Sequence, residues 1–395
     1  MTTTEKIREL AQQQTGYVQE QRRRIHANPE LSYEEKETAA LVAAELKALG
    51  LEVVENVGGR HGVVAVIPGR GPGKNVVLRA DMDALSIQEE TGLPFASQCP
   101  GKMHACGHDA HTAMLLGAAR VLAAMRQDYD GTVRLVFQPA EEKTPDGGAK
   151  AIVTSGVLGD VDAIYGLHVW PQLPTGTVGV KAGPLMAASD NIVIEIGGKS
   201  SHAAMPHRGI DAVAAAGQFI TAVQDVISRQ INPLHPAVLT FGKIYGGSRY
   251  NIIAEKVTIE GTCRTYQKET QDYIEAQLGR LLAGIDAIFG TTSTLNYNRG
   301  YGAVVNDADQ AALAASVVRQ HFGDAALVEL AEPAMTAEDF SGYLTTYKGA
   351  FLWLGTGRSD GEVYPLHNAR FTVDEGTLPI GVELLAGLAL GALEK

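Results

Sequence analysis

Short, strongly apolar segments that alternate with helix-like segments are the feature that most limits how this chain can fold. The apolar segments are rich in β-branched residues and occupy residues 51–54, 63–67, 76–78, 133–137 and 163–169. Between them lie segments with apolar residues at helical spacing, for example residues 112–125. A uniformly apolar strand needs cover on both faces, so the pattern predicts an α/β sheet with helices on its two sides.

One helix near the N-terminus has both a start and a stop signal. Ser32 and Glu35 have the spacing of a capping box. Apolar residues at helical spacing follow them, and Gly50 is a typical helix stop. The sequence therefore predicts a capped helix that ends at Gly50.

The pattern changes near Asn191, where a second kind of segment begins. Its expected elements are a strand at 192–196, a helix at 213–227, strands at 238–244 and 253–263, a helix at 274–285 and a strand at 293–297. This β-α-β-β-α-β order is that of a ferredoxin-like domain.

The first pattern then resumes, with a helix near 309–321, a strand at 350–354 and a terminal helix from about residue 378. We therefore predict one discontinuous α/β domain, formed by residues 1–186 and 300–395. The smaller domain, residues 187–299, is inserted into it.

The charge balance disfavours nucleic acid as a partner. The chain has 33 Lys and Arg against 45 Asp and Glu, a formal net charge of -12, whereas phosphate binding needs concentrated positive charge. Three cysteines are too few, and odd in number, for a disulfide framework. The least polar stretch, residues 384–393, is shorter than a membrane span, and no apolar leader is evident. We therefore expect a soluble cytoplasmic protein with no membrane partner.

Residues 103–111 bring one thiol and three imidazoles close together in the sequence. These side chains belong to Cys106, His104, His108 and His111. A single Cys or His is usually structural, but thiolate and imidazole together favour borderline divalent metal ions. A closed structural zinc site would need more Cys and His pairs than this segment supplies. The cluster therefore indicates an open metal site.

Carboxylates follow two of the apolar strands. Glu141 and Glu142 come after one strand, at the end where open α/β sheets place their active sites. One of them can bind a metal while the other stays free. Asp81 and Asp83 close another strand, either as carboxylates that orient a ligand histidine or as ordinary loop acids.

Two further histidines are expected near the same sheet edge. His168 is predicted at the end of a strand, and His367 lies in a turn-like segment. Each alone is more often structural. If the strand ends converge, a metal can lower the pKa of bound water to about 7, and the free carboxylate can move its proton. The residues therefore predict metal-assisted hydrolysis of an amide or ester.

Six motifs occur in succession along the chain. They are Cys106-Gly107-His108-Asp109, Gln138-Pro139-Ala140-Glu141-Glu142, Gly166-Leu167-His168, Ser201-His202-Ala203 with Pro206-His207, Ala337-Glu338-Asp339-Phe340, and His367-Asn368. In this order they resemble the M20 metallopeptidases, specifically the N-acyl-amino-acid amidohydrolases that include hippurate hydrolases and plant auxin-conjugate hydrolases. The resemblance extends from about Arg22 to the C-terminus.

The resemblance implies a mixed-sheet α/β/α catalytic domain that holds two divalent ions, with an inserted domain that acts as a lid and often mediates dimerisation. By motif position the metal ligands are Cys106, His108, Glu142, His168 and His367. Cys106 is the bridging ligand. Manganese or zinc is favoured, and nickel or cobalt stays open.

The resemblance also implies the roles of three further residues. Glu141 is the general base. His202 reaches the scissile carbonyl or the substrate carboxylate, and Asn251 assists it. Arg79 stands where the wider M20 group has a ligand histidine, so no ligand role is carried to Arg79 or Asp81.

The expected reaction removes an acetyl, benzoyl or other aryl-acyl group from an amino acid, as a homodimer or higher homo-oligomer. A dipeptidase or aminopeptidase of the same superfamily is the alternative within hydrolases. A metal-binding scaffold is the alternative outside enzymes, because a fold alone does not establish activity. Met186, Tyr301 and Phe340 are apolar candidates for an acyl pocket, and ordinary core packing explains them equally well.

Overall fold

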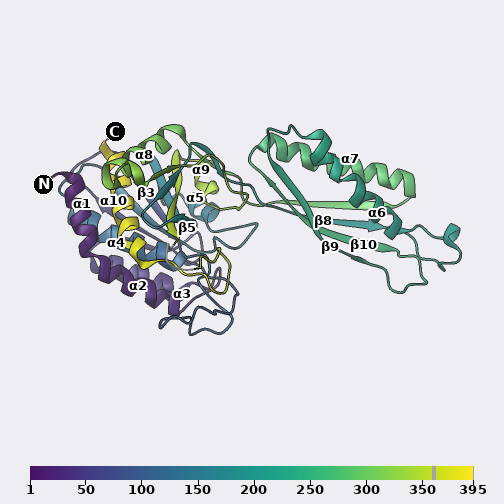
Figure 1. Cartoon of the computed structure of the whole chain (residues 1–395), viewed down its shortest axis with the longest axis horizontal. Helices are drawn as coiled ribbons and strands as arrows, with labels where there is room; N and C mark the ends of the chain where they lie inside the picture. The colour runs from purple at the N-terminus through teal and green to yellow at the C-terminus, as the bar shows by residue number, and fades with distance from the viewer. Residues whose placement is uncertain (358–361, 395) are drawn as a thin grey trace. The chain divides into compact units, whose positions relative to one another are not determined.

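The structure, a computed structural model, describes residues 1–357 and 362–394. It contains two compact units, each with its own sheet (Figure 1). Unit 1 comprises Met1–Leu185, Val305–Pro333 and Asp339–Lys395, and unit 2 comprises Met186–Val304 and Ala334–Glu338. Unit 1 is therefore discontinuous in sequence.

Unit 1 is built on a mixed eight-stranded sheet with the order β1-β2-β4-β3-β5-β14-β6-β13. Its strands are β1 Glu52–Val57, β2 Gly62–Pro68, β3 Asn75–Asp81, β4 Thr132–Gln138, β5 Ala163–Pro174, β6 Val178–Val180, β13 Leu327–Glu329 and β14 Gly349–Gly357. Strand β3 pairs in parallel with both β4 and β5, and β14 pairs in parallel with β5. The predicted α/β class is confirmed.

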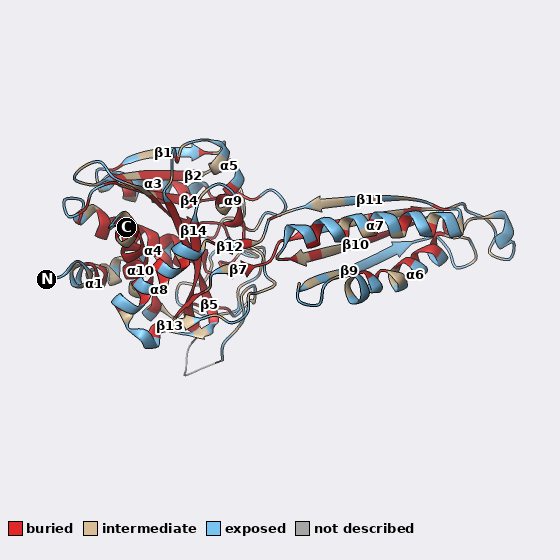
Figure 2. Cartoon of the chain, turned by 90° about the horizontal axis from the view of Figure 1, so that it is seen from above, coloured by how far each residue is buried: buried red, intermediate tan, exposed pale blue. Residues whose placement is uncertain are grey.

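Helices pack against this sheet and against one another. They are α1 Thr3–Gln13, α2 Thr15–Ala27, α3 Lys36–Ala48, α4 His108–Ala124, α5 Ala149–Thr154, α8 Ala308–Phe322, α9 Ser341–Leu344 and α10 Leu378–Glu394. Helices α4 and α10 contact the middle strands, and α1 and α2 contact α4 and α10 in turn. Figure 2 shows buried residues concentrated on the strands and on helices α4 and α10. Each fully buried Leu or Val there contributes about 1.5–3 kcal/mol.

The C-terminal helix is the most apolar element of unit 1. The stretch Glu375–Glu394 has a mean hydropathy of 1.6 and is long and apolar enough to cross a bilayer by length and composition. It is longer than the apolar stretch expected from the sequence. Within the protein 72% of it is buried, as in a core helix.

Three local expectations were wrong. Helix α4 begins at His108 instead of residue 112, so the histidine cluster reaches into its first turn. Strand β5 continues to Pro174, which places His168 inside the strand. The capping box before α3 does not form, because Glu30 accepts the N–H groups of Glu37 and Thr38 instead.

Unit 2 contains a four-stranded antiparallel sheet with the order β11-β8-β10-β9. Its elements are β8 Asp190–Gly197, α6 Ala212–Ala222, a π-helix Val226–Gln230, β9 Ala237–Gly246, β10 Lys256–Thr265, α7 Lys268–Phe289 and β11 Thr292–Arg299. Alternate residues of β8 are buried and form one core with residues of α6 and α7. Two short strands, β7 Gly183–Met186 and β12 Val304–Asn306, lie at the boundaries of the units along the chain.

Candidate metal centre

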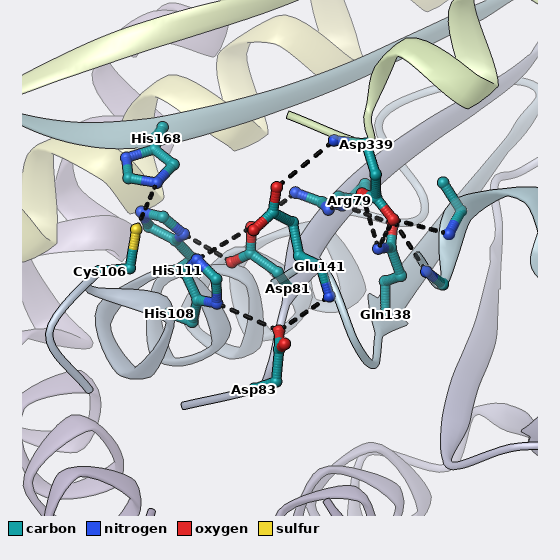
Figure 3. A network of polar contacts seen from close by, with 12 residues as sticks. Arg79, Asp81, Asp83, Cys106, His108, His111, Gln138, Glu141, His168 and Asp339 are labelled. Carbon is teal, nitrogen blue, oxygen red and sulfur yellow. Dashed lines mark hydrogen bonds and ion pairs between the residues drawn. The ribbon is translucent and has the colours of Figure 1, made fainter. Parts of the chain in front are cut away.

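The candidate site lies where the parallel strands of unit 1 end. Asp81 on β3 lies opposite Gln138 on β4 in the ladder, so the segments after these two strands begin side by side. Asp83 follows β3, and Glu141 follows β4. Figure 3 shows these carboxylates facing the imidazoles of α4.

Cys106 belongs to two groups of potential metal ligands. Its Sγ lies 3.3 Å from His168 Nε2, and the ligand atoms of Cys106, His108 and His168 lie within 4.8 Å of one another. Cys106, Glu142 and His367 form a second group by the same measure. His367 Nε2 lies 3.1 Å from Glu142 Oε1. The five expected ligands thus lie together in two groups that share the thiol.

Local backbone geometry brings three of these ligands together. Gly107 has φ +90°, which lets the chain turn between Cys106 and His108, and a Cβ on it would lie 2.4 Å from Val169 Cγ2. The His367 N–H donates to the Ala105 carbonyl at 2.8 Å. His367 is thereby attached to the segment that carries Cys106.

Asp81 and Asp83 each orient a histidine of α4. Asp83 Oδ1 lies 3.3 Å from His108 Nδ1, and Asp81 Oδ1 lies 2.6 Å from His111 Nδ1. His111 Nε2 accepts the Val169 N–H at 2.9 Å, so both of its nitrogens have partners. His108 Nε2 is buried without a hydrogen-bond partner among the described residues. His108 Nε2 lies 3.8 Å from Asp81 Oδ2, beyond hydrogen-bonding distance, so this nitrogen can still bind a metal. Both nitrogens of His111 are already hydrogen-bonded.

The charges around the thiol favour cations. Burial, followed by the charges of Glu142 and Glu141, raises the pKa of the Cys106 thiol well above its usual value. Burial alone would raise the pKa of Asp81, but the neighbouring His108 and other cationic groups lower it well below its usual value. A buried thiol surrounded by carboxylates becomes favourable as a thiolate when divalent ions offset the negative charge. The residues present therefore fit a centre for two divalent ions.

Glu141 lies beside the two ligand groups and has a hydrogen-bond partner outside them. Its Oε1 lies 3.4 Å from the backbone N–H of Asp339, and its carboxylate also lies within 4.8 Å of ligand atoms of His108 and Glu142. Asp339 in turn accepts hydrogen bonds from Arg79 Nη2 and Gln138 Nε2, both at 2.8 Å. This placement leaves Glu141 beside the ligands and 6% exposed.

A second buried network, which the sequence analysis missed, supports the start of α4. Asp109 Oδ2 accepts from Arg22 Nε at 2.9 Å and lies 2.8 Å from His26 Nδ1. Burial would lower the pKa of His26, but Asp109 and Glu89 raise it to about 9. The only sequence signal was the composition of α2, with Arg22 and His26 four residues apart.

The remaining candidates are not members of the ligand groups described above. His202 and Asn251 are in unit 2, where the N–H of the residue after His202 donates to the Asn251 carbonyl at 3.1 Å. Met186 and Tyr301 are also in unit 2 and are buried. Phe340 is fully buried in unit 1, with its ring 4.8 Å from that of Phe351, so core packing accounts for it.

Comparison with known proteins finds relatives of this chain over most of its length. The sequence model of peptidase family M20/M25/M40 matches residues 77–391. N-acetylcysteine deacetylase of Bacillus subtilis is 40% identical, covering 94% of this chain and 96% of the relative. Thermostable carboxypeptidase 2 of Saccharolobus solfataricus is 37% identical over 99% of both chains. The crystal structure of the Bacillus subtilis YXEP protein, described as a dinuclear metal binding peptidase from the M20 family, superposes with a TM-score of 0.84 at 37% identity, covering 96% of this chain and 98% of the other.

Proposed function

We propose that this chain, which belongs to peptidase family M20, is a metal-dependent amidohydrolase. Its reaction releases amino acids from their N-acyl derivatives. The observation that carries the proposal is the thiol of Cys106 shared between two ligand groups, with a further carboxylate, Glu141, beside them. The similarity to a deacetylase of an N-acylated amino acid supports this substrate class.

The residues divide into ligands and a proton carrier. Cys106 would hold both ions, His108 and His168 would complete one ligand group, and Glu142 and His367 the other. When bound, the ions supply Lewis acidity that activates a water molecule and polarises the scissile carbonyl. Manganese or zinc suits this mixed set of sulfur, nitrogen and oxygen donors, as do nickel and cobalt.

Glu141 performs the proton transfers. Its carboxylate accepts a proton from the attacking water and later donates it to the nitrogen of the leaving amino acid. The Asp339 N–H at 3.4 Å from Oε1 orients this carboxylate. Burial of Glu141 keeps bulk water from competing for the proton.

We assign the lid and dimerisation roles to the smaller unit, predicted as residues 187–299. The element order β8-α6-β9-β10-α7-β11 in an antiparallel sheet supports a ferredoxin-like domain. His202 and Asn251, adjacent on this unit, are the proposed substrate contacts.

The proposed oligomeric state is a homodimer, which light scattering can test. A cytoplasmic location is supported by the three free cysteines.

Substitution of the two adjacent acids separates their roles. Glu141→Gln should lower kcat by about 10²- to 10⁴-fold while bound metal stays near the wild-type content. Glu142→Gln should lower both kcat and bound metal. Turnover of N-acetyl and N-benzoyl amino acids and metal content by elemental analysis measure the two effects. A Glu141→Gln protein with normal turnover would refute the assigned base.

A peptidase is the second candidate, because the carboxypeptidase relative matches 99% of the chain. Parallel assays with free dipeptides and N-blocked amino acids distinguish the two activities. An aminopeptidase site would favour substrates with a free α-ammonium group.

A further inference from the structure

The turn that carries Glu141 and Glu142 is held by two buried carboxylates, those of Glu35 and Asp83. Three consecutive backbone N–H groups of this turn donate to them. Ala140 N donates to Glu35 Oε1 at 2.7 Å. Glu141 N and Glu142 N donate to the two oxygens of Asp83, each at 3.0 Å. The turn is therefore fixed through its backbone, independently of the acid side chains.

Ala140 has a backbone conformation that needs such support. Its φ is +59°, in the left-handed region that residues other than glycine rarely adopt. Ala140 is also fully buried, so its N–H would lack a partner if Glu35 were absent. Strained residues of this kind persist only where the surroundings determine them.

The side chain of Glu35 is available to the turn because it does not cap α3. It precedes α3 and makes no side-chain cap. Ser32, the other residue of the expected capping box, donates from Oγ to Asp83 Oδ2 at 2.6 Å. Ser32 therefore binds one of the two carboxylates under the turn, and Glu35 supplies the other, while Glu30 caps the helix.

Burial of the Glu35 carboxyl group is energetically unfavourable, so we ask which contact requires this group. It is fully buried, and a carboxyl group loses its hydration there. An apolar side chain of similar size would fill the same space without that cost. The cost is understandable if the acceptor is needed to keep the turn in one conformation.

We propose that Glu35 is a positioning residue that, together with Asp83, sets the directions in which Glu141 and Glu142 leave the turn. The proposal rests on the proposed function for the roles of those two acids. Glu142 must reach the group of Cys106 and His367, whereas Glu141 must stay beside the Asp339 N–H. Rotation of the preceding peptide displaces both acids together, and a displacement of about 1 Å at a reacting group can cost about 10²-fold in rate.

Three substitutions of Glu35 test this role. Glu35→Leu keeps the volume but removes the acceptor, and Glu35→Asp keeps the carboxyl group but withdraws it from the Ala140 N–H. Glu35→Gln keeps an amide oxygen in place as an acceptor. We expect kcat to fall about 10- to 100-fold in Glu35→Leu and by a smaller factor in Glu35→Asp. We expect KM to change by less than about threefold in both, and Glu35→Gln to retain kcat within about threefold.

Glu383→Leu is the matched control for destabilisation. Glu383 is another buried carboxylate, 3.0 Å from His321 Nδ1 and 3.2 Å from Arg8 Nε, and it links α1, α8 and α10. At temperatures below its unfolding transition, the Glu383→Leu protein should keep the wild-type kcat. Equal losses of kcat in Glu35→Leu and Glu383→Leu would refute a positioning role, as would equal losses in Glu35→Gln and Glu35→Leu.

The visible absorption of the cobalt-substituted proteins gives a readout that does not need a substrate. Because Glu142 is a proposed ligand on the same turn, Glu35→Leu should change this spectrum and Glu35→Gln should preserve it. If Glu35→Leu does not fold, the comparison of Glu35→Asp with Glu35→Gln decides the question in the same way. If the wild type hydrolyses no N-acyl amino acid, the proposed function fails, while the spectra still test the turn. Identical spectra in all variants would overturn the proposal.

Discussion

Replacing Glu35 by Gln should change how the stability of unit 1 depends on pH. Burial, followed by the negative charge of Asp83, raises the pKa of Glu35 from 4.5 to about 7. The folded protein therefore binds a proton at this carboxyl more tightly than the unfolded chain does. Between pH 4.5 and 7 the unfolded state has lost that proton while the folded state keeps it, so stability falls as pH rises.

The size of the effect follows from the difference in pKa. A difference of about 2.5 units, at 1.36 kcal/mol per unit, corresponds to roughly 3 kcal/mol. This cost is absent at low pH and complete above pH 7. Glutamine does not titrate, so Glu35→Gln should become more stable relative to wild type as pH rises, by most of this amount between pH 5 and 8.

Tryptophan fluorescence during urea unfolding can measure this difference for unit 1 alone. The chain has two tryptophans, and Trp170 and Trp353 stack with ring centroids 3.9 Å apart on β5 and β14. Both proteins should be treated with chelator, so that competition between protons and metal ions at the ligands does not contribute. Parallel stability curves for the two proteins from pH 5 to 8 would refute the reasoning.

Two further substitutions test the support of α4 and the turn before it. Arg22→Met leaves the buried carboxylate of Asp109 with one fewer cationic partner. The free energy of unfolding, measured by the same fluorescence assay, should fall by about 3–5 kcal/mol. A fall of less than about 1 kcal/mol would contradict the supporting role of Arg22. Gly107→Ala places a Cβ 2.4 Å from Val169 Cγ2, on a residue with φ +90°. This substitution should lower the free energy of unfolding by about 1–3 kcal/mol. Metal affinity, measured by competition with a chelator, should fall at least about tenfold, and unchanged affinity would show that the turn tolerates the shift.

Local sequence pattern was sufficient for many helices and strands. Apolar runs at 76–78 and 133–137 lie inside β3 and β4, because a strand buried on both faces must be apolar throughout. The helix predicted near 274–285 lies inside α7, where one apolar face contacts the sheet. Helices α1 and α2 were missed because both are polar overall. Only Ile7 and Ala11 are buried in α1, and Val18 and Ile25 are among the few buried apolar residues of α2.

The candidate ligands could also be named from their chemistry and their order, because thiol, imidazole and carboxylate side chains in such motifs are rare outside metal sites. Their convergence depends on parallel pairing of β3 with β4 and β5, which aligns strand ends that are far apart in the chain. Pairing of that kind leaves no local signal in the sequence.

The capping-box residues show most clearly where the sequence was insufficient. Ser32 and Glu35 have the right spacing to cap a helix, and local chemistry alone favours that use. In the folded protein Ser32 instead binds Asp83, and Glu35 binds the Ala140 N–H. The sequence by itself determined the helix and the chemistry available at the site. Only the tertiary structure decided which partner each polar side chain takes, because a buried N–H or carboxylate from a distant segment competes more strongly than an exposed helix end that water can satisfy.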